Sequence, residues 1–351
     1  MLLSFLTIGL VGLASTADAF CIPRIRREWR TLSKSEKKAY IDAVQCLWDK
    51  PAKVQTRFPG IKNRHDDFVF MHLNATENIV LDPVLGPQTP GGGIHLNGVF
   101  LPWHRYMLWE YENALVNECG YNGAQPYWDW SRDTPEFGGD FATSPIFDPV
   151  TGFGGNGAGG TVPITDLQAA LFGPPVGNCI NDGPFASRTL WLGPSYTFNQ
   201  TARCMKRNIQ GAFGNTAQSW SANVVPCLQK QTYAEFAAAV DTDTGATGNF
   251  LGIHGGGHYG TGGEMLNLWS SINDPIFYLH HANLDRIWWS WQLLGSGRLT
   301  EIGGPRYGNG SGTVTLDTQL WMGYNAQDRP IRQVMDPLNL NGQGILCYVY
   351  L

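Results

Sequence analysis

The sequence predicts a mainly α-helical protein built on a four-helix bundle, with long loops and few short strands. Three observations support this fold class. Apolar residues recur at helical spacing in several segments, and the C-terminal LCYVYL is a short strand candidate. Most histidines lie inside the helical segments, among aromatic residues. The 351 residues, of which 43% are hydrophobic and 13 are Trp, are enough to bury a large core.

Residues 1–19 have the pattern of a secretory signal peptide. Their apolar run ends in Ala17-Asp18-Ala19, the small-x-small pattern of a cleavage site, and is shorter than the roughly 20 residues of a bilayer span. We therefore expect a secreted protein with no membrane segment, in which residues 20–351 form a single domain. Removing Asp18 leaves 28 of the 29 acidic residues against 24 basic ones, and no basic run indicates a nucleic-acid partner.

The seven cysteines fit disulfides better than a metal or redox motif, because no C-x-x-C pair is present. The connectivity cannot be derived, and Cys21–Cys347 and Cys46–Cys119 are offered as guesses. An odd count leaves at least one thiol unpaired. Glycosylation would fit the same compartment, and the three sequons begin at Asn74, Asn199 and Asn309.

The first predicted helix covers 34–49, where a capping box of Ser33 and Glu36 precedes apolar residues at helical spacing. Four arginines lie just before it and are expected to form a solvated face or to donate salt bridges: Arg24, Arg26, Arg27 and Arg30. A second helix is predicted over 64–74, with His72 on its apolar stripe. His65, beside two aspartates, is expected to be exposed.

A long helix is predicted over 101–118, opened by Pro102 in its first turn and carrying His104 among large apolar side chains. His95 lies on the loop before it, after a Pro/Gly-rich segment at 82–93. Further along, the pattern predicts mostly irregular structure over 121–160 and helical segments at 165–172, 201–212 and 229–240.

His254 and His258 are four residues apart, so on a helix both imidazoles face the same way and can share one metal ion. The three glycines between them disfavour a helix by about 1 kcal/mol each. The zinc-protease motif H-E-x-x-H is excluded because Gly255 replaces the glutamate. The esterase motif HGGG is excluded because the chain contains no G-x-S-x-G.

The last predicted helix runs from Asp274-Pro275 to about Leu294 and carries His280 and His281, which cannot face the same way. The remaining 296–351 is turn-rich. Six histidines are arranged most economically as two clusters of three: His72, His95, His104, His254, His258 and one of His280 and His281. Each one alone could be a hydrogen-bonded core residue, but that is a poor explanation for all six. Imidazole-only ligation argues against a di-iron site, and copper, zinc, iron and nickel remain open.

The chain contains five longer motifs: D-D-F-V-x-x-H at 66–72, H-x-x-G-x-F-L-x-W-H-R at 95–105, Q-P-Y-W-D-W at 125–130, H-x-x-x-H at 254–258 and D-P-I-F-Y-L-H-H-A-N-L-D-R-I-W at 274–288. By these motifs it resembles the tyrosinase and catechol oxidase family of type-3 copper proteins, in particular its short secreted fungal forms. The terminal Tyr348-Val349-Tyr350 also matches. The resemblance covers the chain from the first helix to the last residues.

The resemblance implies a four-helix bundle that holds a dinuclear copper site. Copper A would be held by His72, His95 and His104, and copper B by His254, His258 and His281, with His280 in a supporting or packing role. With dioxygen as co-substrate, such a site oxidises catechols, and in some members aminophenols or small activated phenols, to ortho-quinones. Small phenols are therefore the expected partners, and the oligomeric state is not predicted.

Three further residues are assigned by the resemblance. Phe277 matches a gate position where a ring stacks over the phenol, although a core role explains it as well. Gly255 replaces an Asn that often supports monophenol hydroxylation, so we expect weak or restricted activity on monophenols. Tyr259 would line the entrance or pack beside the helix. The glycines at 255–257 would leave room beside the metal.

Gly93 stands where many fungal members have a cysteine joined to a ligand histidine, so no thioether is expected. Long members carry a C-terminal lid domain after the Tyr-x-Tyr strand, and none is expected here. Two rival hypotheses remain. A hemocyanin-like protein would bind dioxygen reversibly at the same six histidines, and a zinc hydrolase would use only the pair His254 and His258.

Overall fold

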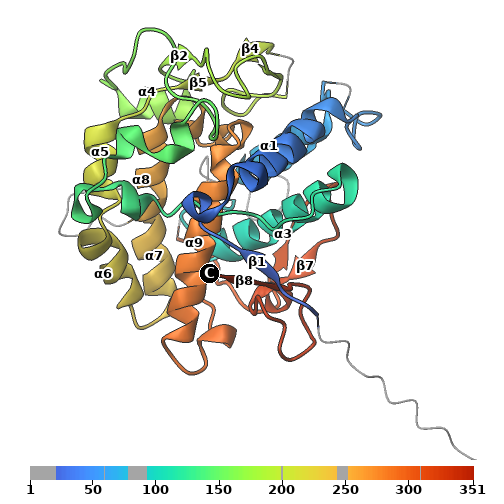
Figure 1. Cartoon of the computed structure of the whole chain (residues 1–351). Helices are drawn as coiled ribbons and strands as arrows, with labels where there is room; N and C mark the ends of the chain where they lie inside the picture. Colours follow the sequence, from blue (N-terminus) through green and yellow to red (C-terminus); the bar gives the residue numbers. More distant parts are fainter. Residues whose placement is uncertain (1–20, 59, 78–92, 199–200, 243–251, 309) are drawn as a thin grey trace, which may run out of the picture.

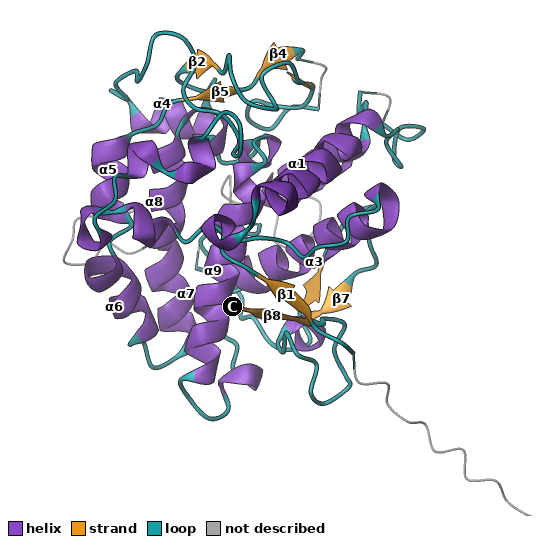
Figure 2. Cartoon of the chain, viewed as in Figure 1, coloured by secondary structure: helices purple, strands orange, loops and turns teal. Residues whose placement is uncertain are grey.

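The computed structural model describes residues 21–58, 60–77, 93–198, 201–242, 252–308 and 310–351. Helices form most of the regular structure and the strands are short, which confirms the predicted fold class (Figures 1 and 2). The helices are α1 (Lys34–Asp49), α2 (Arg64–Glu77), α3 (Phe100–Cys119), α4 (Leu167–Phe172), α5 (Gly211–Ala217), α6 (Val225–Leu228), α7 (Tyr233–Thr242), α8 (Gly252–Thr261) and α9 (Ile276–Leu293). The strands are β1 (Arg24–Arg26), β2 (Asn178–Cys179), β3 (Thr189–Leu190), β4 (Arg203–Cys204), β5 (Lys206–Arg207), β6 (Gln319–Leu320), β7 (Arg329–Pro330) and β8 (Tyr348–Tyr350).

Helices α2, α3, α8 and α9 carry seven of the eight histidines, all except His95. Helix α3 packs against α9, α9 packs against α8, and α1 covers α2 and α3. The capping box of α1 is present: Ser33 Oγ accepts from Glu36 N–H, and the Glu36 carboxylate accepts from Ser33 N–H at 2.8 Å. Helix α3 ends at Gly120, whose left-handed backbone (φ 68°) closes it.

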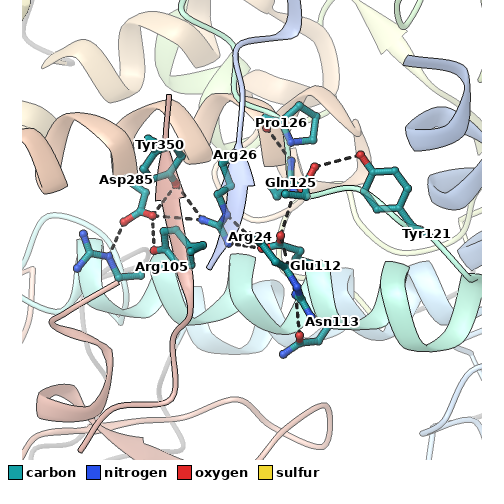
Figure 3. Close-up of polar contacts among 12 residues, drawn as sticks. Arg24, Arg26, Arg105, Glu112, Asn113, Tyr121, Gln125, Pro126, Asp285 and Tyr350 are labelled. Atoms are coloured by element: carbon teal, nitrogen blue, oxygen red, sulfur yellow. Dashed lines mark hydrogen bonds and ion pairs between the residues drawn. The ribbon is translucent and has the colours of Figure 1, made fainter. Parts of the chain in front are cut away.

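The two ends of the described chain meet in a parallel pair, β1 with β8. Beneath it lies a buried network around Arg26, shown in Figure 3. Arg26 Nη2 lies 2.6 Å from Glu112 Oε2 on α3, and its Nη1 donates to Tyr350 Oη at 2.8 Å. Asp285 on α9 accepts from Tyr350 and pairs with Arg105. Of the two alternatives predicted for the arginines, the salt-bridge donor is confirmed for Arg26 and the solvated face is not, because Arg26 is fully buried. Removing one partner of such a network typically costs about 3–5 kcal/mol.

Three disulfides are present, and both guessed pairs, Cys21–Cys347 and Cys46–Cys119, are confirmed. The third joins Cys179 to Cys204, and Cys227 is buried and takes part in none of these three disulfides. Residues 1–19 and the sequons at Asn199 and Asn309 lie outside the described residues, while Asn74 is half-buried on α2. Within the described ranges, no helix has the length and hydropathy needed to span a bilayer.

Two local predictions are wrong. The segment 201–212 is not one helix, because its first part forms the short strands β4 and β5, next to the disulfide at Cys204, and α5 begins only at Gly211. His65 is not exposed: it is fully buried and stacks on Trp48 with ring centroids 3.6 Å apart. Its neighbours Asp66 and Asp67 are buried as well, so the polar sequence gave no sign of this environment.

Candidate metal centre

The first cluster consists of His72 on α2, His95 on the loop before α3, and His104 on α3. Their ring centroids are 5.3–5.8 Å apart, and one ligand nitrogen from each ring lies within 4.8 Å of the others. Each side chain is at most 3% exposed. These three residues are called triad A below.

Backbone carbonyls orient two rings of triad A. His72 Nδ1–H donates to Trp269 O at 2.7 Å, and His104 Nδ1–H donates to Phe100 O at 2.8 Å, one helical turn earlier. A proton fixed on Nδ1 leaves the lone pair on Nε2. Both rings therefore present a ligand atom to the centre of the triad.

The second cluster, triad B, consists of His254 and His258 on α8 and His281 on α9. Their centroids are 4.6–5.4 Å apart. His258 Nδ1–H donates to Met265 O at 2.5 Å. His254 Nδ1–H instead donates to a carboxylate, Asp241 Oδ1, at 2.6 Å. Sequence reasoning missed Asp241, which lies at the end of α7, because nothing in its local pattern connects it to a histidine 13 positions away.

His280 lies within the same cluster, but both of its nitrogens have other partners. Trp130 Nε1–H donates to His280 Nδ1 at 3.2 Å, and His280 Nε2–H donates to the His254 carbonyl at 3.1 Å. No lone pair is left for a metal ion. Of the adjacent histidines on α9, His281 is therefore the one available as a ligand.

The two triads face each other across a short gap. The rings of His104 and His281 stack with centroids 4.3 Å apart, and those of His95 and His254 are parallel at 5.9 Å. Phe277 is fully buried beside them, 4.1 Å from the His281 ring and 5.2 Å from the His72 ring. Two metal ions, one per triad, would be close neighbours.

Burial keeps five of the six imidazoles in the neutral form that binds metal. It lowers the pKa of His72 to about 4. Burial first, and the neighbouring imidazoles second, lower the pKa well below the ordinary range for four others: His95, His104, His258 and His281. Within the described part of the chain, the buried Nε2 atoms of His72, His104 and His254 have no hydrogen-bond partner. Because buried polar atoms normally have partners, these nitrogens fit metal ions well.

The glycines of α8 allow close packing. A Cβ at Gly257 would lie 2.3 Å from His280 Cε1, and one at Gly256 would lie 2.7 Å from Gln218 Nε2. Of the three glycines between the ligands, the described lining of the adjoining cavity includes only Gly255. The expectation that all three leave room beside the metal is therefore wrong for Gly256 and Gly257, which let α8 approach α9 and α5.

A cavity of about 140 Å³ opens onto triad B and His95. Gly255 lies in its lining. Tyr259 does not: it packs on Phe213 with centroids 4.1 Å apart, which favours the packing alternative for this residue. Phe277 also lies behind the ligands, outside the described lining.

Residues 62–294 match the model of a family described as the common central domain of tyrosinase. This stretch contains both triads. The chain belongs to the tyrosinase family. It is therefore a copper oxidoreductase, and the family fold implies a dinuclear copper site, which the two triads fit.

Individual relatives agree. The chain is 34% identical to Tyrosinase ustQ of Aspergillus flavus, over 93% of this chain and 79% of that one. It is 32% identical to N-acetyl-6-hydroxytryptophan oxidase ivoB of Emericella nidulans, over 93% and 92%. Among solved structures, a mutant polyphenol oxidase from Thermothelomyces thermophila is 32% identical with a TM-score of 0.75, over 94% of this chain and 89% of that one. The tyrosinase fold is thus shared along nearly the whole length.

Proposed function

We propose that this tyrosinase-family enzyme oxidises o-diphenols to o-quinones with dioxygen at two copper ions, one in each triad. Copper A would be held by His72, His95 and His104, and copper B by His254, His258 and His281. The observation that carries the proposal is the convergence of two buried imidazole triads beside a cavity. When bound, the copper pair supplies the electron transfer between the phenol and dioxygen.

The chain's own residues would position and protect the reacting groups. Hydrogen bonds to Trp269 O, Phe100 O and Met265 O fix three of the rings. Phe277 closes the space between the triads with an apolar ring, which limits access of water. The cavity gives a phenol a route to the triad B side, past Gly255.

A preference for diphenols over monophenols follows from Gly255. A monophenol must lose its proton before it is oxidised in the ring, and position 255 offers no side chain to orient a water for that step. Tyrosine should therefore be oxidised more slowly than catechol. Gly255→Asn should raise the ratio of initial rates on p-cresol and 4-methylcatechol, with Gly255→Ala as the matched control. An unchanged ratio in the Asn variant would refute this role.

Oxygen uptake by the purified, copper-loaded protein tests the proposal. We expect about one dioxygen to be consumed for every two catechols, because each catechol gives up two electrons when it becomes a quinone and dioxygen takes up four on reduction to water. A protein that binds dioxygen but oxidises no catechol or aminophenol would be hemocyanin-like instead. One zinc ion and no copper would favour a hydrolase at His254 and His258.

We also propose that the mature protein is secreted, begins near Phe20 and forms one domain. The apolar residues 1–19 and the three disulfides support this. N-terminal sequencing of protein recovered from the culture medium tests it, and a chain that begins at Met1 and stays inside the cell would contradict it.

A further inference from the structure

The mouth of the cavity is apolar. Of the residues in its described lining, those that are not buried define the mouth, and they are Gly255 and four apolar side chains, Leu96, Leu171, Phe172 and Leu268. The buried residues of the lining include His95, His254 and His258, which form the floor. Leu96 is 48% exposed and Phe172 is 38% exposed, so a molecule entering from solvent meets hydrocarbon first. This surface is much less polar than the histidine floor below it.

A hydrogen bond and a ring contact hold two sides of the mouth in place. Leu268 N–H donates to Leu171 O at 3.0 Å, which ties the loop after α8 to α4. The ring of Phe172 packs edge-on against Trp269, with centroids 5.5 Å apart. These contacts fix apolar side chains on both segments.

Leu96 forms another side of the mouth in an unfavourable backbone conformation. Its φ is 56°, in the left-handed region that leucine rarely adopts. Its N–H donates to Asp241 Oδ2 at 2.5 Å, and this contact helps to hold the strained residue. The fold thus keeps a half-exposed leucine at the opening despite its conformational cost.

The described lining of the cavity contains no Lys or Arg, so apart from the copper ions of the proposed function it offers no positive charge to an anionic substrate. Asp241 is the one acidic residue in the described lining, and its two oxygens already accept from His254 Nδ1 and Leu96 N–H.

We propose that this cavity selects catechols whose ring substituent is neutral and apolar, and disfavours those that carry a carboxylate. This inference rests on the proposed diphenol oxidase activity and names its substrate class. An alkyl or ester substituent buries apolar surface against Leu96, Phe172 and Leu268, which favours its binding. A carboxylate at the same place loses hydration without gaining a cationic partner, and Asp241 repels it.

A matched pair of substrates tests the selection. The compounds are 3-(3,4-dihydroxyphenyl)propanoate and its methyl ester, which share the ring and the two-methylene tether and differ in charge. At neutral pH and low salt, we expect kcat/KM for the ester to exceed that for the acid by about tenfold or more, mainly through KM. Equal values, or a preference for the acid, would overturn the inference.

Substitutions at the mouth test whether its residues set the preference for the ester over the acid. Leu268→Arg places a cation at the mouth and should lower KM for the acid selectively, so that the ester-to-acid ratio falls. Leu268→Met adds no charge and should preserve the ratio. Phe172→Lys, on the opposite segment, repeats the test if Leu268→Arg does not fold. If neither cationic variant lowers KM for the acid, the mouth does not set this preference and the inference is wrong.

Different experimental results would overturn the inference and the proposed function. If the protein oxidises unsubstituted catechol but treats acid and ester alike, only the inference is overturned. If it oxidises no catechol, the proposed function fails and the inference fails with it.

Discussion

The two triads perform the same task with different structural support. Triad A takes His72 and His104 from α2 and α3, and backbone carbonyls orient both rings. Triad B takes two ligands from the ten-residue α8, and a carboxylate, Asp241, orients His254. Asp241 also accepts from Leu96 N–H, next to His95 of triad A, so it connects the two halves.

The difference shows which half depends on side chains other than its ligands. Triad A uses backbone carbonyls, Phe100 O for His104 and Trp269 O for His72, which remain when the side chain of either residue is substituted. Triad B requires α7 for Asp241 and requires α9 to pack closely against the glycines of α8. We therefore expect triad B to be the half that is more easily disturbed by substitutions that do not touch a ligand.

The largest predicted effect is the loss of a ligand. His281→Ala or His104→Ala should reduce catechol turnover by more than about 100-fold, because each removes one of three imidazoles from a metal ion. His65→Phe is the matched control: it removes a buried histidine outside both triads and keeps the stack on Trp48. Steady-state oxygen uptake measures all three. Comparable losses in the control would mean that general damage, not ligation, explains the result.

A smaller effect is predicted for Asp241→Asn. The amide removes the charge that supports His254 and can accept at only one of the two existing contacts. In a His104→Ala background, where copper is confined to triad B, copper affinity should fall by about 10–100-fold in a chelator competition. In a His258→Ala background, which confines copper to triad A, the fall should be smaller. Equal losses in both backgrounds would show that Asp241 does not distinguish the halves.

The smallest effect concerns stability. Gly257→Ala should destabilise the apo-protein by about 2 kcal/mol. The added methyl would overlap His280, and the free-energy cost of this overlap exceeds the gain in helix propensity from replacing Gly with Ala. Gly255→Ala makes the same chemical change beside the cavity and should be neutral or slightly stabilising. Urea unfolding of both variants gives the comparison. A Gly257→Ala protein as stable as the parent would contradict the packing role given to this glycine.

Much of the fold was predictable because short stretches of sequence determine where its helices begin and end. The capping box at Ser33, the proline in the first turn of α3, and apolar spacing along α9 predict those helices within about two residues. The grouping of six histidines was predictable from their residue type and setting. The family resemblance selected His281 from the adjacent pair on α9, and the contacts of His280 with Trp130 and the His254 carbonyl support that choice.

What the sequence could not predict depends on partners far along the chain. His65 was expected to be exposed, yet packing against Trp48 buries it. Arg26 was expected to lie on a solvated face or to donate salt bridges, and its salt-bridge partners, Glu112 on α3 and Asp285 on α9, could not be identified from the sequence. Asp241 orients His254 by accepting a hydrogen bond from it, and in the sequence the two residues are separated by a segment outside the described residues. No local pattern encodes any of these three.

Copper stoichiometry in single-triad variants tests the central claim most directly. The parent protein should bind about two copper ions per chain, and His104→Ala and His258→Ala should each bind about one, since each variant leaves one triad intact. His65→Phe should still bind about two. A parent protein that binds a single zinc ion and no copper, or a His104→Ala protein that still binds two copper ions, would contradict the two-triad account.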